Sequence, residues 1–197
     1  MQLLMQNITI ALYMSHPPRN TVADNHLVVT AMGKNVPENM DQLFRYLKES
    51  SCSISECRVS LLGGEMCGML MLSGSWDTVA KIEDSIPRLA TRLDMNISIQ
   101  RTSLANLNGN LMPYAIDVIA FDRAGIVYDI VNFMCQNNIG IQDLHTNIYR
   151  ANHTGTNMFS MHMAVNIPAD ISIASLRGDF MDFCDQLNLD AIMEPIK

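Results

Sequence analysis

The chain repeats one order of apolar segments twice, and this internal duplication limits the folds open to it more than any other feature. In each half, apolar residues at strand or helix spacing follow in the order strand, helix, strand, strand, helix, strand. Ile54 aligns with Ile141, and Met32 aligns with Phe121 when the first half is given a slightly longer first turn. The sequence therefore predicts two copies of one small unit.

In the first half, the helices have amphipathic spacing and the strands have apolar runs or alternation. Asn35 or Asn39 is the candidate cap of the first helix, and Ser75 is the candidate cap of the second. Cys57, Val59 and Leu61 alternate as in a half-buried strand. The predicted elements are a strand at 26–32, a helix through Met40, Leu43, Phe44 and Leu47, a strand at 51–62, a turn at Gly63-Gly64, a strand at 66–72, a helix through Val79, Ile82, Ile86 and Leu89, and a strand at 95–100.

The second half follows the same plan after a polar stretch. Its two hairpin strands are separated by a turn at residues 153–156, which we expect to be centred on Thr154 and Gly155. The predicted elements are strands at 114–121, 139–149, 158–167 and 189–196, with helices at 125–137 and through Ile173, Leu176, Phe180, Phe183 and Leu187.

This order is that of the split β-α-β, or ferredoxin-like, unit. The predicted fold class is α+β, with two ferredoxin-like βαββαβ domains in tandem. Each domain is an antiparallel sheet with both helices on one face, and its first and third strands are central. We expect an N-terminal tail at 1–23, domains at 24–101 and 112–197, and a polar linker at 102–111.

Charge and hydropathy exclude several classes of function. The formal net charge is −7 and no run of basic residues occurs, which argues against direct binding of nucleic acid. The apolar segment near the N-terminus is too short to span a bilayer, so we expect no membrane contact. The five cysteines form no C-x-x-C pair, which is typical of reduced thiols in a cytoplasmic protein.

Methionine is in excess, with 16 residues. Most of these residues lie in apolar strands and helices, where we interpret them as core filler. The alternative is an adaptable binding surface, because the thioether side chain is flexible and polarizable.

The stretch Asp122-Arg123-Ala124-Gly125-Ile126-Val127 joins a predicted strand to a predicted helix. A glycine in such a turn lets the backbone approach another group closely. The first N–H groups of the helix have no partner within it and lie at the positive end of its dipole. The turn can therefore hold a carboxylate with backbone groups alone. The alternative is that Asp122 is a plain cap and Gly125 a plain turn residue.

With these features, the two halves resemble ACT domains, the ligand-sensing modules of amino-acid metabolism. The turn at 122–127 is close to the family pattern D-R-x-G-[IL]-[VL], and Asn138-Ile139-Gly140-Ile141 fits the pattern N-[IV]-x-I. The tandem arrangement is similar to that of the glycine cleavage system transcriptional repressor family. The first half departs from the pattern, since residues 33–39 lack Asp-Arg-x-Gly and Glu38 stands near the position of Gly125.

The resemblance implies a regulator without catalysis and without a cofactor. It implies a small amino acid such as glycine or serine as ligand, and contact with a transcription activator protein rather than with DNA. It places the ligand-binding residues at Asp122, Arg123, Ala124, Gly125, Ile126, Asn138 and Ile139, with a second possible site at Gly33, Lys34, Asn35 and Glu38.

The expected binding mode uses both charged ends of an α-amino acid. The N–H groups of Ala124, Gly125 and Ile126 would take the carboxylate, and Asp122 or Asn138 the ammonium. Asn138 has an alternative interpretation as part of a polar helix exit. A bulky residue in place of Gly125 is expected to abolish binding and to leave thermal stability nearly unchanged.

A group of histidines in the second hairpin is the candidate metal site that we weigh against this interpretation. With the expected turn, His145, Asn147 and His162 point away from the helices, and Asn147 lies opposite His162. His145 and His162, even with Asp143 nearby, form an incomplete ligand set, so we predict no metal site. No G-x-S-x-G turn or convergent acid set suggests a hydrolase.

Three functions remain open at this point. They are an amino-acid sensor that represses transcription through a partner, a stand-alone regulatory subunit of a biosynthetic enzyme, and a metal-dependent enzyme. Unpaired edge strands favour pairing with a second copy, so we expect a homodimer.

Overall fold

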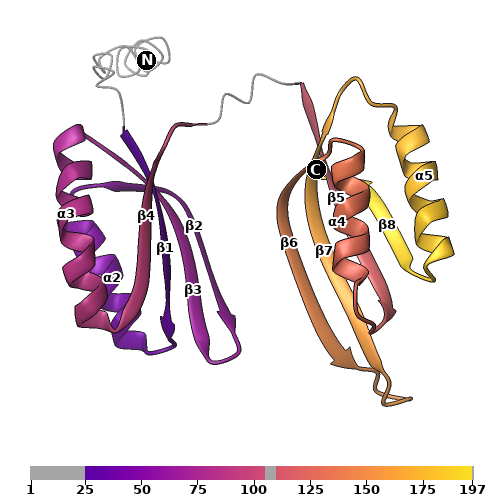
Figure 1. Cartoon of the computed structure of the whole chain (residues 1–197), viewed down its shortest axis with the longest axis horizontal. Coiled ribbons are helices and arrows are strands. Elements are labelled where there is room, and N and C mark those ends of the chain that lie inside the picture. The colour runs from indigo at the N-terminus through magenta and orange to yellow at the C-terminus, as the bar shows by residue number, and fades with distance from the viewer. Residues whose placement is uncertain (1–24, 105–109, 197) are drawn as a thin grey trace, which may run out of the picture. The chain divides into compact units, whose positions relative to one another are not determined.

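The computed structural model describes residues 25–104 and 110–196, which form two compact units separated near residue 105. Figure 1 shows the secondary structure of each unit. The predicted tail at 1–23 and the middle of the predicted linker lie outside the described residues. Strands take up both ends of that linker, because β4 extends to Thr102 and β5 begins at Leu111.

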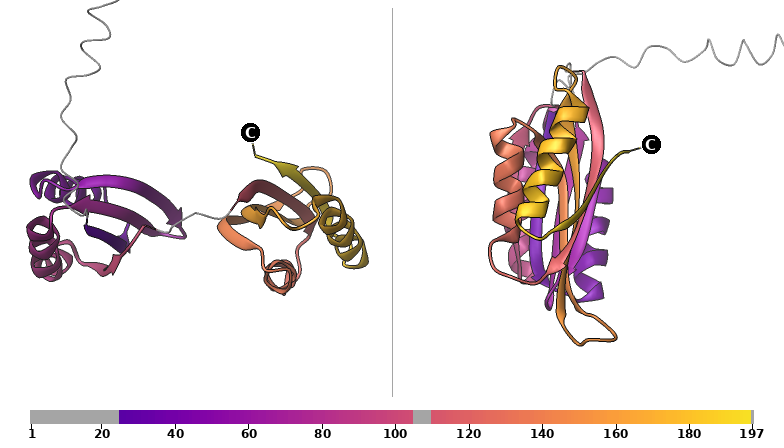
Figure 2. Two further views of the ribbon diagram at one scale, coloured as in Figure 1. Left: turned by 90° about the horizontal axis from the view of Figure 1, so that it is seen from above. Right: turned by 90° about the vertical axis from the view of Figure 1, so that its right-hand side faces the viewer.

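The first unit is a four-stranded antiparallel sheet with two helices. The strand order is β2-β3-β1-β4, so the first and third strands of the unit are central, as predicted. Both helices cover one face of the sheet (Figures 1 and 2). The elements are β1 (Asn25–Lys34), α2 (Pro37–Glu49), β2 (Ser53–Leu62), β3 (Glu65–Gly74), α3 (Trp76–Leu93) and β4 (Met95–Thr102).

The second unit repeats this topology with the order β6-β7-β5-β8, and its four strands are again antiparallel. The predicted fold class, two ferredoxin-like βαββαβ units in tandem, is therefore confirmed. The elements are β5 (Leu111–Phe121), α4 (Ile126–Gln136), β6 (Gly140–Arg150), β7 (Asn157–Pro168), α5 (Ile173–Gln186) and β8 (Asp190–Pro195).

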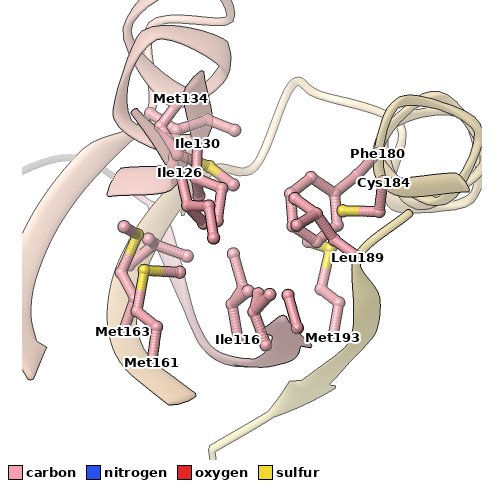
Figure 3. Packing of buried hydrophobic residues seen from close by; sticks show 14 of the residues in the cluster. Ile116, Ile126, Ile130, Met134, Met161, Met163, Phe180, Cys184, Leu189 and Met193 are labelled. Carbon is pink, nitrogen blue, oxygen red and sulfur yellow. The ribbon is translucent and has the colours of Figure 1, made fainter. Parts of the chain in front are cut away.

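Each unit has its own hydrophobic core between its sheet and its helices. In β1 the buried residues are Leu27, Val29 and Ala31, which follow the two-residue period of a strand with one face covered. In the second core, residues of α4 lie above Met161 and Met163 of β7, and residues of α5 lie beside Met193 of β8 (Figure 3). The prediction that methionines fill the core holds for Met66, Met95, Met134, Met161, Met163 and Met193, which are all buried.

The caps of the first two helices differ from one another. Ser75 caps α3 as predicted, because its hydroxyl accepts a hydrogen bond from the Thr78 N–H. The predicted asparagine cap of α2 is wrong, since Val36 occupies the cap position without a side-chain hydrogen bond. Pro37 begins this helix, and its ring presets the helical φ angle without needing a hydrogen-bonded N–H.

Strand β2 is not half-buried as predicted. All ten of its residues are exposed, including Cys57, Val59 and Leu61. The alternation is present, but β2 is an edge strand and α3 packs against β1, β3 and β4. The helix-facing side chains of β2 therefore remain uncovered within the unit.

Candidate functional site

The turn at residues 122–125 lies between the end of β5 and the start of α4. The Asp122 N–H donates a hydrogen bond to the carbonyl oxygen of Asn157 at 3.1 Å, which ties the turn to the neighbouring hairpin. Gly125, and not Asp122, occupies the helix cap position, with a left-handed φ of 94° and no side-chain hydrogen bond. The alternative in which Asp122 is a plain cap is therefore not what the structure shows.

The free N–H groups of this turn are suited to binding an anion. Within the described part of the chain, no hydrogen bond uses the N–H of Ala124, Gly125 or Ile126, and the helical ladder begins with Asp129 N–H to Gly125 O at 2.9 Å. Unpaired donors at the positive end of a helix attract a carboxylate or phosphate.

An open hollow of about 600 Å³ lies against this turn. One wall is the turn itself with Val127 and Tyr128, and the other wall comes from strands β6 and β7. The sheet residues Thr146, Asn147, Ile148 and Phe159 were not among the predicted ligand-binding residues. The sequence held a signal for Thr146 and Ile148, because they alternate with His145 and Asn147, which were expected to point away from the helices. Strand β6 is also an edge strand in contact with α4.

Arg123 supplies the positive charge nearest to the turn. Its guanidinium lies 3.2 Å from Asp129 Oδ2 and donates a weak hydrogen bond to Ala124 O at 3.4 Å. Both side chains of this ion pair are partly exposed, so water or a ligand can exchange with the contact. The guanidinium is therefore held at the first turn of α4, beside the free N–H groups.

Ile126 contributes to this site only through its backbone. Its side chain is 1% exposed and packs in the core with Ile130 and Met134 (Figure 3). A substitution at this position would therefore report on packing and not on ligand contact.

Asn138 and Ile139 lie at the opposite end of α4. The helix has 11 residues, which at a rise of 1.5 Å per residue separates its ends by about 16 Å. Asn138 takes a left-handed φ of 56°, and its N–H donates to Cys135 O at 3.1 Å. Asn188 has the same conformation after α5, with a φ of 55°, and its N–H donates to Asp185 O at 3.1 Å. The helix-exit interpretation therefore accounts for Asn138, since asparagine tolerates this conformation.

The expectation that a bulky residue at Gly125 leaves stability unchanged is wrong for this backbone. No atom lies within 4 Å of a Cβ placed there, so a side chain has space. The φ of 94° is nevertheless a conformation that residues other than glycine adopt only with strain.

The corresponding turn of the first unit offers fewer free donors. The Asn35 N–H donates to Gly64 O at 3.3 Å, the Val36 N–H donates to Lys34 O at 2.8 Å, and Pro37 has no N–H. Gly33 lies within β1, and a Cβ there would come 2.7 Å from Met95 Cγ. Lys34 and Glu38 are exposed at the two ends of the turn. The first strand-to-helix turn of the first unit therefore lacks both the Asp-Arg-x-Gly pattern and the free N–H groups that the second unit has at 124–126.

The histidines of the second hairpin are paired differently from the prediction. His145 lies directly opposite His162, and Asn147 lies opposite Ser160. The last strand pair is Arg150 with Asn157, which centres the turn between His153 and Thr154, one residue earlier than expected. The predicted pairing of Asn147 with His162 is therefore wrong.

Each of these histidines has its own carboxylate. His162 Nδ1 lies 2.7 Å from Asp117 Oδ1, and His145 Nε2 lies 2.7 Å from Asp143 Oδ2. Over residues 25–104 and 110–196, no group of three or more His, Cys, Asp or Glu side chains is arranged to hold a metal ion. The arrangement is that of two separate polar pairs on the sheet face away from the helices.

Comparison with known proteins agrees with the fold. The ACT domain model matches residues 25–100. A UPF0237 protein of Methanopyrus kandleri is 30% identical over 40% of this chain and 82% of its own length. The chain belongs to the ACT-domain family. The glycine cleavage system transcriptional repressor of Escherichia coli is 23% identical, over 84% of this chain and 87% of its own length.

Solved structures share the tandem ACT fold. One was provisionally assigned as a glycine cleavage system transcriptional repressor and has a TM-score of 0.69 at 22% identity, with 89% of this chain and 99% of that chain covered. A protein from Galdieria sulphuraria has a TM-score of 0.73 at 19% identity, covering 88% and 99%. These two structures show the fold, whereas the repressor relative and the domain model support a regulatory ACT protein.

None of the helices in the described residues is long and apolar enough to cross a membrane.

Proposed function

We propose that this protein is an amino-acid-responsive regulator that represses glycine cleavage genes through contact with a transcription activator. It has no catalytic role and needs no cofactor. The observation that carries the ligand-binding part is the set of unpaired N–H groups at 124–126, in a turn that lines the hollow of about 600 Å³. The name of the repressor relative supports the regulatory part.

The ligand in this proposal is a small α-amino acid, with glycine and serine as the first candidates. The N–H groups of Ala124, Gly125 and Ile126, with the guanidinium of Arg123, receive the carboxylate. Asp122 lines the same hollow and receives the ammonium. Asn138 and Ile139 lie too far away within the unit, and would reach the same ligand only from a second copy of the chain.

The regulatory step follows from differential affinity. A ligand changes the activity of such a protein only if it binds one arrangement of the protein more tightly than another. The net charge of −7 disfavours direct contact with DNA, so the output is a change in protein contact. The proposed protein acts in the cytoplasm as a homodimer, and its five cysteines are all free thiols in the structure.

Calorimetric titration with glycine, serine and the other small amino acids tests the proposal. We expect saturable binding that Arg123→Gln weakens by tenfold or more, since the variant removes a charge-assisted contact with the carboxylate. Arg177→Gln is the matched control, because Arg177 is an exposed arginine on α5 outside the hollow. Binding of equal strength in both variants would reject this site, and no binding of any amino acid would reject the sensor.

Co-purification with the wild-type chain tests the partner. Recovery of a transcription activator, with a yield that changes on addition of the bound amino acid, is the expected result. Recovery of a biosynthetic enzyme instead would replace the repressor role by that of a regulatory subunit.

A further inference from the structure

The sheet face of the first unit that carries no helix is apolar along its middle. The helices lie on the opposite face (Figure 2), where Leu27, Val29 and Leu70 are buried. On the open face, Met69 is 52% exposed and Met32 is 50% exposed. Val28 and Met71 are half-buried beside them. In the described strands of the first unit, only this face has exposed methionines that could form an adaptable binding surface.

Strand register sorts the side chains of this face into two central rows. Pairing across β2, β3, β1 and β4 gives a first row of Glu56, Met71, Val28 and Gln100. The same pairing gives a second row of Arg58, Met69, Thr30 and Ser98. A hollow of about 250 Å³ lies over the two rows and is lined by Val28, Glu56, Arg58, Met69 and Met71 among others.

The two rows are complementary to each other. Each has a charged residue on β2, a methionine on β3 and an uncharged polar residue on β4, and the charges are of opposite sign. Consider a two-fold axis that lies in the plane of the contact, parallel to the two rows and midway between them. Rotation about this axis places the first row of one copy over the second row of the other. Glu56 then faces Arg58, and Met71 faces Met69. A symmetric dimer requires this kind of self-complementary surface.

We infer that a second copy of this chain covers this face, sheet against sheet. Sheets pack face to face at a spacing of about 10 Å, with interdigitated side chains. Four strands spaced by about 4.8 Å, over eight residues with a rise of about 3.3 Å, give roughly 500 Å² in projection. Side-chain relief adds to this area, which brings it towards the 800 Å² or so per partner of a standard interface.

Charge distribution favours a second copy over other occupants. A strongly basic or acidic partner would match only one of Glu56 and Arg58 and would repel the other. A second copy matches both at once. The inference names the surface of the homodimer in the proposed function, and it differs from the expected edge-strand pairing, in which the β2 strands of two copies would join one sheet.

Reversal of single charges tests the complementarity. Glu56→Arg and Arg58→Glu each give both rows the same sign, so we expect the dimer dissociation constant of the full chain to rise tenfold or more in sedimentation equilibrium. The double variant Glu56→Arg/Arg58→Glu restores opposite signs and is expected to return the constant to within about threefold of wild type. Weak dimerisation of the double variant would overturn the inference.

A second pair of variants separates face packing from edge pairing. Met69→Glu places a charge in the middle of the open face, whereas Val59→Glu places one on β2 but on the helix side, opposite Gly68. Both side chains are about half exposed, so both variants are expected to fold, as circular dichroism would show. We expect Met69→Glu to be monomeric and Val59→Glu to remain dimeric.

The opposite pattern would show a homodimer formed through the edge, which overturns this inference and leaves the homodimer of the proposed function intact. A wild-type chain that is monomeric at all concentrations would overturn both. Neither result depends on the amino-acid titration, so failure of the ligand site is detected separately.

Discussion

Ile126 follows Gly125 directly, yet the two residues have opposite surroundings. Ile126 is 1% exposed and lies in the core, whereas Gly125 is exposed and has no atom within 4 Å of the place that a Cβ would take. The left-handed φ of 94° at Gly125 reverses the chain so that the next side chain points inwards. The N–H groups at 124–126 donate to no partner among the described residues, so the same short turn provides both a core side chain and a set of free donors.

Substitution of Gly125 is expected to lower both stability and ligand affinity. Gly125→Ala should reduce the free energy of unfolding by about 1–2 kcal/mol, because a Cβ is strained at positive φ. Gly178→Ala is the matched control, since Gly178 is exposed within α5 without a positive φ, and alanine there should stabilise by about 0.5–1 kcal/mol. Urea unfolding measures both. Equal effects of the two variants would contradict the assigned strain at Gly125.

Truncation of Phe180 should lower the stability of the second unit more than truncation of any other side chain in its core. Its side chain is fully buried, and its ring lies 5.3 Å from that of Phe133 between α4 and α5. Phe180→Ala should lower the free energy of unfolding by about 3–5 kcal/mol, through lost burial and the cavity left behind. Hydrogen exchange resolved by peptide should show faster exchange in α4, α5 and β5. Tyr128→Ala, at an exposed position on α4, is the control and should change the exchange of this core little.

The order of the elements was predictable from periodicity, and the sheet order follows from the split β-α-β unit that this order defines. Alternation in β1 and helical spacing in α3 specify which side chains are buried, and the duplication gave two independent views of the same unit. Ser75 was predictable as a cap because a hydroxyl side chain at that position satisfies a free N–H.

Other features depend on backbone details that residue types do not specify. The hairpin at 151–156 could be centred on any of several polar residues, and a shift of one residue moved the partner of His162 from Asn147 to His145. The N-terminus of α2 was set by Pro37 rather than by an asparagine. The hollow exists only because α4 and β6 leave a gap between them. Residue types can assign Thr146 and Ile148 to one face of the sheet, but they do not predict that gap.

The five cysteines should differ in reactivity. Burial, with a smaller contribution from the charge of Asp185, raises the pKa of the Cys184 thiol to about 11, and burial also raises the pKa of Cys52. Thiolate is the reactive form, so Cys184 should resist a disulfide reagent at pH 8 in the folded protein. Exposed Cys57 and Cys135 should react first. Mass spectrometry after brief labelling measures this order, and early labelling of Cys184 would contradict its burial.

The ion pair between Glu83 and Arg101 should make stability depend on acidic pH. Arg101 Nε and Nη2 donate to the two carboxylate oxygens of Glu83 at 2.8 and 2.7 Å. These hydrogen bonds lower the pKa of Glu83 against the opposing effect of desolvation, and the charge of Arg101 adds a smaller lowering contribution.

A carboxyl group with a lowered pKa in the folded state stabilises the fold at pH values above its unfolded pKa of about 4.3. This contribution is lost as the pH falls through the lower, folded pKa. Glu83→Gln should therefore lower the melting temperature at pH 7, and this effect should shrink as the pH falls and the wild-type carboxyl takes up a proton. Glu49→Gln, at the exposed end of α2 and outside the proposed dimer face, is the control for loss of a charge in the same unit. A difference between Glu83→Gln and wild type that stays constant from pH 3 to pH 7 would show that the pair does not act through its charge.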